Sequence, residues 1–313
     1  MGEQVDRTDT AAGTTPAKKI LITGAHSYIG TAVEAWLLQT PDQYQVDTLD
    51  MKNPAWREVD FTGYDVVYHV AGIAHEDVSS VSRERQKQYY EVNTDLAVET
   101  ALRARKAGVH QFIFMSSMIV YSGCDEKVIT EETQPKPSDF YSDSKWRADQ
   151  LIREMDTDSF KVVILRPPMV YGKGCKGNYV QLDAIARKLP VFPIVNNTRS
   201  MLYIENLCQF VKLMIDHEES GVFFPQDGEY VNTSDLVQMI AQAKGHRMLM
   251  LPLTDLPVRT LRRAPGKIGI LAQKAFGDCA YDMSMSEYQE DYRVRTLTEA
   301  VRLTASATGE ERA

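Results

Sequence analysis

The sequence has little of what marks a secreted, metal-binding or membrane-spanning protein. Its four cysteines (Cys124, Cys175, Cys208 and Cys279) are far apart and show neither a C-x-x-C motif nor zinc-ligand spacing. No apolar run is long enough to cross a bilayer, and no charged-then-apolar leader opens the chain. We therefore expect no bound metal, no membrane insertion, reduced thiols and a cytoplasmic location.

Basic residues are also in the minority. The 313 residues include 35 basic and 43 acidic side chains, a net charge of −8, which argues against nucleic acid as a partner. The 43% hydrophobic and 25% charged fractions are typical of a globular protein of one large α/β domain or two unequal lobes. Residues 1–17 are small, polar and without periodicity, so we predict a disordered tail.

A strand, a glycine turn and a helix are predicted directly after that tail. Residues 19–23 form a short apolar run, the turn spans Gly24 to Gly30, and an amphipathic segment follows. This arrangement holds the pyrophosphate of a dinucleotide at a helix N-terminus. Ser27 stands where a middle glycine is usual, and two roles stay open for its hydroxyl: a bond to phosphate or a helix cap.

The next segments add a ribose-binding candidate and a close backbone approach. Asp50 follows a strand and lies 26 residues after Gly24, where a carboxylate would bind the ribose hydroxyls and favour NAD over NADP. The alternative is a turn aspartate. A buried strand over residues 64–72 ends in Ala71 and Gly72, which are small enough to let the cofactor come close. We predict one amphipathic helix over 84–107, with Leu102 facing inward.

The chemical candidates are a serine, a tyrosine and a lysine. Ser117 follows the predicted strand over 111–115, at the edge where open α/β sheets bind ligands. Tyr141 and Lys145 begin a helix predicted to reach about residue 155, and their four-residue spacing places them on one face. We expect the ammonium to lower the pKa of the phenol, so that the phenol can exchange a proton with a sugar oxygen.

Together these segments resemble the extended short-chain dehydrogenase/reductase family, most closely its nucleotide-sugar epimerases and ketoreductases. The resemblance is carried by Thr23-Gly24…Gly30, Asp60-Phe61, His69-Val-Ala-Gly72, Asn93, Ser116-Ser117-x-x-Val-Tyr121, Tyr141-x-x-x-Lys145 and Arg166-Pro-x-x-Val-Tyr-Gly172. It implies an α/β fold: a doubly wound Rossmann-type parallel sheet in 18–172 and a smaller C-terminal substrate-binding lobe in 173–313. A segment at about 221–225 would return to the main sheet.

The resemblance also implies roles for single residues. Tyr141 would be the acid/base, Lys145 would hold the nicotinamide ribose, and Ser117 would bind the sugar oxygen. With Tyr141 and Lys145, the residues expected to line the NAD site are Gly24, Ser27, Tyr28, Ile29, Gly30, Asp50, Asp60, Phe61, Ala71, Gly72 and Asn93. UDP-galactose 4-epimerases keep a lysine where Ala74 stands, so the match to that enzyme is incomplete.

Two further residues are expected to bind the substrate. The segment from Arg199 to Leu207 resembles one that lends an arginine to the nucleotide diphosphate, and a guanidinium suits that group because it donates two parallel hydrogen bonds. Asn178 resembles an asparagine that approaches the same phosphates. The alternative for Arg199 is a surface position in a loop.

Three functions follow from this resemblance. The one we predict is an NAD-dependent nucleotide-sugar 4-epimerase of the UDP-hexose class, which Asp50 favours. A 4-ketoreductase of a nucleotide-linked sugar would use the same three side chains with fresh NAD(P)H, and residues 173–179 resemble such enzymes. A non-catalytic NAD-binding sensor is the third, although such a protein would typically lose Tyr141 or Lys145. The resemblance further suggests a homodimer.

Overall fold

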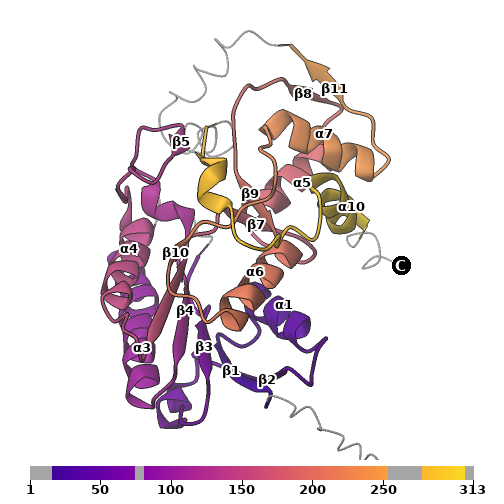
Figure 1. Cartoon of the computed structure of the whole chain (residues 1–313). Coiled ribbons are helices and arrows are strands. Elements are labelled where there is room, and N and C mark those ends of the chain that lie inside the picture. Colours follow the sequence, from indigo (N-terminus) through magenta and orange to yellow (C-terminus); the bar gives the residue numbers. More distant parts are fainter. Residues whose placement is uncertain (1–15, 75–80, 253–276, 307–313) are drawn as a thin grey trace, which may run out of the picture.

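A layered α/β fold is visible in Figure 1, a computed structural model that describes residues 16–74, 81–252 and 277–306. Of the predicted tail, only Pro16 and Ala17 lie within these ranges. The central sheet has parallel strands in the order β2-β1-β3-β4-β6-β10. Their bounds are β1 Lys18–Thr23, β2 Tyr44–Leu49, β3 Val66–His69, β4 Gln111–Met115, β6 Lys161–Leu165 and β10 Gly221–Phe223.

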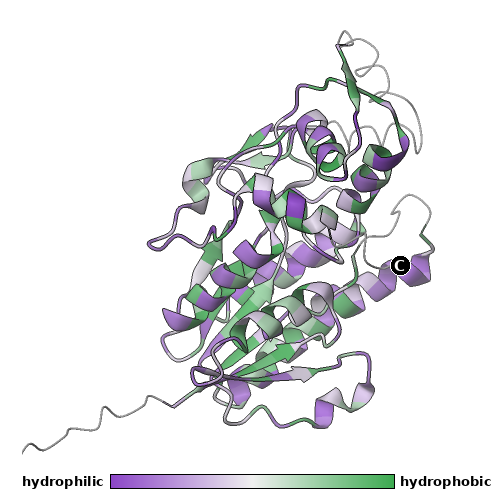
Figure 2. Cartoon of the chain, turned by 90° about the vertical axis from the view of Figure 1, so that its right-hand side faces the viewer, coloured by the Kyte–Doolittle hydropathy of each residue, from purple (hydrophilic) through white to green (hydrophobic). Residues whose placement is uncertain are grey.

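The strands form a sheet because both of their faces are apolar. Successive side chains of a strand point to opposite faces. Ile20 and Ile22 therefore pack on one side of the sheet, whereas Leu21 packs on the other. Figure 2 shows the hydrophobic strands enclosed between helices whose hydrophilic residues face outward. The sheet is thus buried on both sides, as parallel sheets usually are.

Two sets of helices cover the sheet. Helices α1 (Tyr28–Leu37) and α6 (Ile204–Asp216) lie on one face, and α3 (Ala97–Lys106) and α4 (Phe140–Arg153) lie on the other (Figure 1). Helix α2 (Arg83–Tyr90) packs against α4. The predicted single helix over 84–107 is interrupted by a π-helical turn, η3 (Glu91–Leu96). The prediction for Leu102 was wrong: its side chain is 50% exposed, because the small residues Ala97, Ala101 and Ala104 form the inner face.

A smaller group of elements sits above the C-terminal edge of the sheet. Its helices are α5 (Asn178–Lys188), α7 (Thr233–Ala243) and α10 (Leu297–Ser306). Short parallel pairs join β7 (Met169–Tyr171) to β9 (Met201–Tyr203), β8 (Val191–Pro193) to β11 (Leu249–Leu251), and β5 (Val128–Ile129) to β12 (Ala280–Tyr281). Short helical turns are η1 (Pro54–Glu58), η4 (Met118–Tyr121) and η5 (Met283–Ser286).

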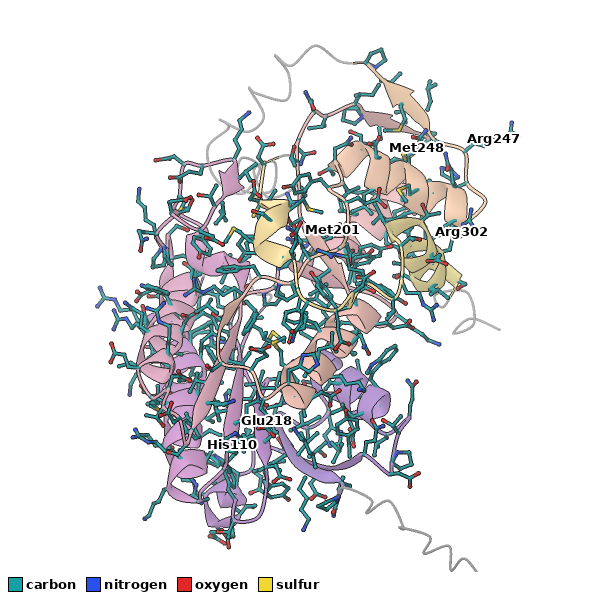
Figure 3. All side chains as sticks on the ribbon, in the orientation of Figure 1. His110, Met201, Glu218, Arg247, Met248 and Arg302 are labelled. Atoms are coloured by element: carbon teal, nitrogen blue, oxygen red, sulfur yellow. The ribbon has the colours of Figure 1, made fainter. Side chains whose placement is uncertain are left out.

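The two ends of the sheet differ in character. At the end where the strands begin, Lys18, His110 and Glu218 line an open pocket. His110 and Glu218 lie close together there (Figure 3). The distance between His110 Nε2 and Glu218 Oε2 is 3.4 Å. At the opposite end, β2 and β3 flank β1 on either side, which creates the crevice where open α/β sheets bind ligands. No helix within the described ranges could span a membrane.

Candidate functional site

The glycine turn at the end of β1 packs closely against the backbone that follows β3. Gly24 has φ +109°, and a Cβ built on it would lie 2.9 Å from the backbone nitrogen of Ala71. A side chain here would be strained and would push β3 away. Ser27 caps α1, because its Oγ accepts the N–H of Gly30 at 3.1 Å. Of the two roles left open for Ser27, the structure therefore shows the cap.

The two residues after Ser27 differ in where their side chains lie. The hydroxyl of Tyr28 is buried and would lie 2.7 Å from a Cβ built on Gly172. The side chain of Ile29 packs against the larger core. Both side chains thus belong to the packing of α1, and only their backbone, in the first turn of the helix, lies where a pyrophosphate would bind.

The predicted ribose side of the site is more open. Asp50 directly follows β2, and its Oδ1 accepts the N–H of Lys52 at 3.0 Å. Asp60 is exposed, and both the N–H and the hydroxyl of Thr62 donate to it, which lowers the pKa of its carboxyl. The ring of Phe61 is buried in the core on the α3 side. Phe61 therefore shapes this corner by packing, while Asp50 stands at the strand end.

Asn93 fixes the loop that follows β3 by hydrogen bonds to its backbone. Asn93, which is fully buried in the π turn, accepts the N–H of Ile73 at 2.8 Å and donates to the carbonyl of Ile73 at 3.1 Å. Its Nδ2 also lies 3.1 Å from Ser144 Oγ. A Cβ on Gly72 would come within 3.1 Å of Asn93 Oδ1. π turns occur often at functional sites, and this one aims Asn93 at the loop after β3.

Lys145, on helix α4, contacts the end of β4 and lies beside Gly72. Its Nζ donates to the carbonyl of Met115 at 3.0 Å and would lie 3.2 Å from a Cβ on Gly72. The ammonium also sits 5.1 Å from the centre of the Phe114 ring. Burial lowers the pKa of Lys145 to about 8, and the nearby Asp149 carboxylate opposes that shift. The structure therefore brings Gly72, Asn93 and Lys145 together.

Tyr141 begins the same helix, but its acidity is not the one predicted. Asp139 caps the helix with a reciprocal bond to Ser142, which fixes the first turn. The ring of Tyr141 packs edge-on against Tyr89, with 5.6 Å between centroids. Burial, followed by Tyr89 and Asp139, raises the pKa of the phenol instead of lowering it. The expected lowering was wrong for this structure because burial of the phenol outweighs any effect of Lys145, whose ammonium donates to the carbonyl of Met115.

The two adjacent serines, Ser116 and Ser117, make different contacts. Ser116 is buried, and its hydroxyl donates to Asp149 Oδ2 at 2.7 Å. Ser117 caps η4 by accepting the N–H of Ile119 at 3.2 Å. A cap uses a lone pair of the oxygen, so the O–H hydrogen of Ser117 stays available for a ligand oxygen.

The predicted substrate residues come from the smaller group of elements. Asn178 is exposed in the first turn of α5. Arg199 is half-buried, bridges Val231 and Cys279 through its backbone, and donates from Nη1 to the carbonyl of Gly277 at 3.2 Å. Cys279 in turn lies 3.1 Å from the sulfur of Met118, the residue after Ser117. Cys279 and Met118 therefore link the backbone of Arg199 to the residue next to Ser117.

Sequence reasoning missed a buried pair beneath these residues. Asp149 and Arg166 form a salt bridge of 2.7 Å with almost no exposure. The available signal was the position of Asp149, four residues after Lys145 on the same helical face. Within the described residues, no group of three or more His, Cys, Asp or Glu could hold a metal.

Comparison with known proteins gives matches over most of the chain. Residues 20–224 match the NAD dependent epimerase/dehydratase family. UDP-glucose 4-epimerase of Vibrio cholerae is 30% identical over 317 residues, covering 93% of this chain and 95% of that protein. N-acetyl-alpha-D-glucosaminyl-diphospho-ditrans,octacis-undecaprenol 4-epimerase of Escherichia coli O157:H7 is 26% identical, covering 76% of this chain and 75% of that protein.

Solved structures share the same fold at lower identity. A dTDP-4-dehydrorhamnose reductase from Clostridium acetobutylicum superposes with a TM-score of 0.71 at 18% identity, covering 93% of this chain and 99% of the other. UDP-glucuronic acid 4-epimerase from Bacillus cereus, solved with NAD, gives a TM-score of 0.66 at 17% identity, covering 92% and 96%. These neighbours confirm the predicted Rossmann-type fold.

Proposed function

The chain belongs to the NAD dependent epimerase/dehydratase family, and we propose that within this family it is a nucleotide-sugar 4-epimerase of the UDP-hexose class. The observation that carries the proposal is the 30% identity to a UDP-glucose 4-epimerase along almost the whole of both chains. The site agrees with it, because Ser117, Tyr141 and Lys145 come from elements that meet at the C-terminal edge of the sheet.

NAD is the cofactor of the family, and the residues that would hold it lie at the C-terminal edge of the sheet. Gly24 and Gly72 suit such a site because the backbone there is too closely packed for a side chain: a Cβ would lie 2.9 Å from the nitrogen of Ala71 or 3.2 Å from Nζ of Lys145. The first turn of α1 would hold the pyrophosphate, Asp50 a ribose, and Lys145 the nicotinamide ribose. When bound, NAD accepts a hydride from a sugar carbon and returns it.

The protein's own residues would handle the proton. As a phenolate, Tyr141 would take the proton of the C4 hydroxyl and become a neutral phenol, and it would later return this proton to the same oxygen, which is general base and then general acid catalysis. Ser117 donates its O–H to that oxygen and holds it in place, while its lone pair stays in the η4 cap. For epimerisation, the site must also let the sugar turn over between the two proton transfers.

One observation favours the second candidate, a 4-ketoreductase of a nucleotide-linked sugar. A phenol carries its proton at neutral pH, and burial of Tyr141 raises its pKa further, so the protonated form is favoured more strongly. A protonated phenol is ready to donate to a keto oxygen, which is how a reductase begins. In the epimerase, Tyr141 must first act as a base, so Lys145 would have to leave the carbonyl of Met115 and approach the phenol.

Arg199 and Asn178 are the residues proposed to bind the diphosphate of a nucleotide sugar. We propose that the guanidinium of Arg199 binds the nucleotide diphosphate, with the amide of Asn178 at the entrance. Each hydrogen bond between the guanidinium and a phosphate oxygen would contribute about 1.5–3 kcal/mol to the binding free energy.

The decisive experiment compares cofactor retention with turnover. Purified protein is denatured, the released dinucleotide is identified by mass, and a second sample is incubated with UDP-glucose without added cofactor. Release of about one NAD per chain, with UDP-galactose as product, supports the epimerase. A site that retains no NAD, with consumption of NAD(P)H only when a 4-keto sugar nucleotide is supplied, supports the ketoreductase and contradicts the first proposal.

We also propose a homodimer formed by the outer faces of α3 and α4. Leu102 on α3 and Leu151 on α4 are 50% and 46% exposed on that side of the molecule. Light scattering at micromolar concentration tests this, and Leu102→Glu should give the mass of a single chain.

The free thiols of all four cysteines agree with a cytoplasmic location.

A further inference from the structure

A buried ionic network lies directly beneath the proposed catalytic residues. Arg166, at the end of β6, donates from Nε to Asp149 Oδ2 at 2.9 Å and from Nη2 to Asp149 Oδ1 at 2.7 Å. This is the two-bond geometry that a guanidinium and a carboxylate favour. Arg166 is 3% exposed and Asp149 is fully buried, so the pair is shielded from water and salt.

The network ties together the elements that carry the site. Ser116, adjacent to Ser117, donates to Asp149 at 2.7 Å. Arg166 also donates to the hydroxyl of Tyr121 at 2.7 Å, at the end of the η4 turn that Ser117 caps. Asp149 itself lies on α4, below Lys145. One carboxylate therefore fixes the ends of β4 and β6 against the catalytic helix.

The guanidinium is held on its flat faces as well. Its carbon lies 5.6 Å from the ring centre of Tyr121, 5.3 Å from that of Trp146 and 5.7 Å from that of Phe224. Rings at these distances attract a cation. Asp149 is therefore positioned by a partner that has little freedom to move.

Lys145 is the second cation that this carboxylate can serve. Lys145 stands one helical turn before Asp149 on the same face. Around Lys145, β3 contributes His69, α4 contributes Asp149, and the π turn contributes the uncharged amide of Asn93. His69 is neutral, because burial and then Lys145 lower its pKa to about 3. Within the described residues, Asp149 is the group that raises the pKa of Lys145 against burial.

We propose that Asp149 is a positioning residue that serves two cations: it locks Arg166 by two hydrogen bonds and supplies the negative charge that keeps Lys145 an ammonium. The inference rests on the proposed function for the importance of Lys145. The charge state of Lys145 can nevertheless be measured without substrate or cofactor. A buried lysine that lost this counter-charge would release its proton more readily.

The test is a titration of Lys145 in the protein without substrate. Lysine labelled with ¹³C at Cε reports protonation by its chemical shift, and the Lys145 signal is identified by its loss in Lys145→Arg. Asp149→Asn keeps the side-chain shape but removes the charge. We expect the titration midpoint of Lys145 to fall by about one pH unit or more, a tenfold or larger change in proton affinity. Asp149→Glu restores the charge and should return most of the shift.

The control removes a comparable carboxylate elsewhere. Asp183 is also buried and pairs with Lys244 at 3.0 Å and Arg187 at 2.8 Å, but in the smaller group of elements. Asp183→Asn should destabilise the fold while leaving the Lys145 midpoint unchanged. An unchanged midpoint in folded Asp149→Asn would overturn the proposal, and so would an equal shift in Asp183→Asn.

A second variant keeps the test usable if Asp149→Asn does not fold. Removing one partner of a buried pair leaves an uncompensated charge, whereas replacing both by apolar side chains is often tolerated. Asp149→Leu combined with Arg166→Met is therefore compared with Arg166→Met alone, because both lack the guanidinium and they differ only in the carboxylate. A Lys145 midpoint that is lower in the double variant supports the proposal, and equal midpoints contradict it. Loss of epimerase activity in Tyr141→Phe is a separate measurement, so the two proposals can fail independently.

Discussion

The crevice at the sheet edge and the group of elements above it supply the proposed site in different ways. At the sheet edge, Lys145 and Asn93 are buried and each is held by backbone carbonyls or amides. In the smaller group, Asn178 is exposed and Arg199 is half-buried in a bridge between separate segments. The residues proposed for proton transfer and cofactor binding therefore lie in a rigid frame, whereas those proposed for substrate binding lie in parts with fewer buried restraints.

The largest effect should come from the rigid side. Tyr141→Phe removes the hydroxyl that exchanges the proton, so we expect turnover of the sugar nucleotide to fall by about 10³-fold, within the range of general acid–base catalysis. NAD content and melting temperature should be unchanged. Tyr90→Phe is the matched control, because the Tyr90 hydroxyl only donates to Asp143 at 2.8 Å. Equal losses in both variants would break the distinction between chemistry and helix packing.

The next effect tests whether the glycine turn is as tightly built as it looks. Gly24→Ala combines a φ of +109° with a Cβ 2.9 Å from a backbone nitrogen. We expect NAD affinity to fall by about 100-fold, because strain of roughly 3 kcal/mol must be relieved by moving the turn. Gly63→Ala has φ +84° but nothing within 4 Å of its Cβ. Calorimetric titration with NAD should show no loss for Gly63→Ala.

A smaller change is expected where the diphosphate is recognised. Arg199→Ala should raise KM for the nucleotide sugar about 30-fold with little change in kcat, because it removes charged hydrogen bonds made to a part that does not react. Arg187→Ala removes another arginine of the same region, which pairs with Asp183, and should leave KM near the wild-type value. A fall in kcat for Arg199→Ala would instead place the guanidinium at the reacting centre.

The last prediction concerns stability, where the end of the sheet meets the smaller group of elements. Asp227 is buried, its Oδ1 accepts the Tyr203 N–H at 2.9 Å and the Asn206 amide at 2.8 Å, and its Oδ2 accepts the Tyr171 hydroxyl at 3.0 Å. Burial raises the pKa of Asp227 to about 6. An acid whose pKa is higher in the folded state stabilises most when protonated, so its contribution is lost as pH rises from about 4 to 6.

This loss of stability with rising pH can be measured by comparing wild type with a variant that lacks the carboxyl. Asp227→Asn does not titrate, so its stability relative to wild type should improve by on the order of 1–3 kcal/mol between pH 4 and 6 and stay level above. Melting curves of both proteins across this range provide the comparison. A difference that moves in the opposite direction, or not at all, would mean that Asp227 is ionised throughout the folded state.

Sequence alone predicted the sheet and the order of the motifs because these depend on local patterns. Strands such as β4 are short apolar runs, and the glycine turn follows the first of them. The inner face of α3 was missed because its packing residues are alanines, which a hydrophobic pattern weights less than Leu102. The pKa of Tyr141 was predicted in the wrong direction because Tyr89, which comes from α2, helps to bury it.

The rest of the site could not be predicted because it depends on contacts between distant segments. The bond from Lys145 to Met115 spans 30 residues and that from Asn93 to Ile73 spans 20. Ser27 illustrates a different limit: the same hydroxyl suits a phosphate or a cap, and only the geometry at Gly30 decides which is made.

The position of β10 bears on how this protein could be re-engineered. β10 pairs with β6 as the outer strand of the sheet, although it follows α5 and α6 in the chain. A substrate module exchanged as one block after residue 172 would carry away both the sheet's border strand and α6, which packs against α1. Chimeras with altered sugar preference would therefore need two separate grafts, one inserted between β7 and α6 and one after β10.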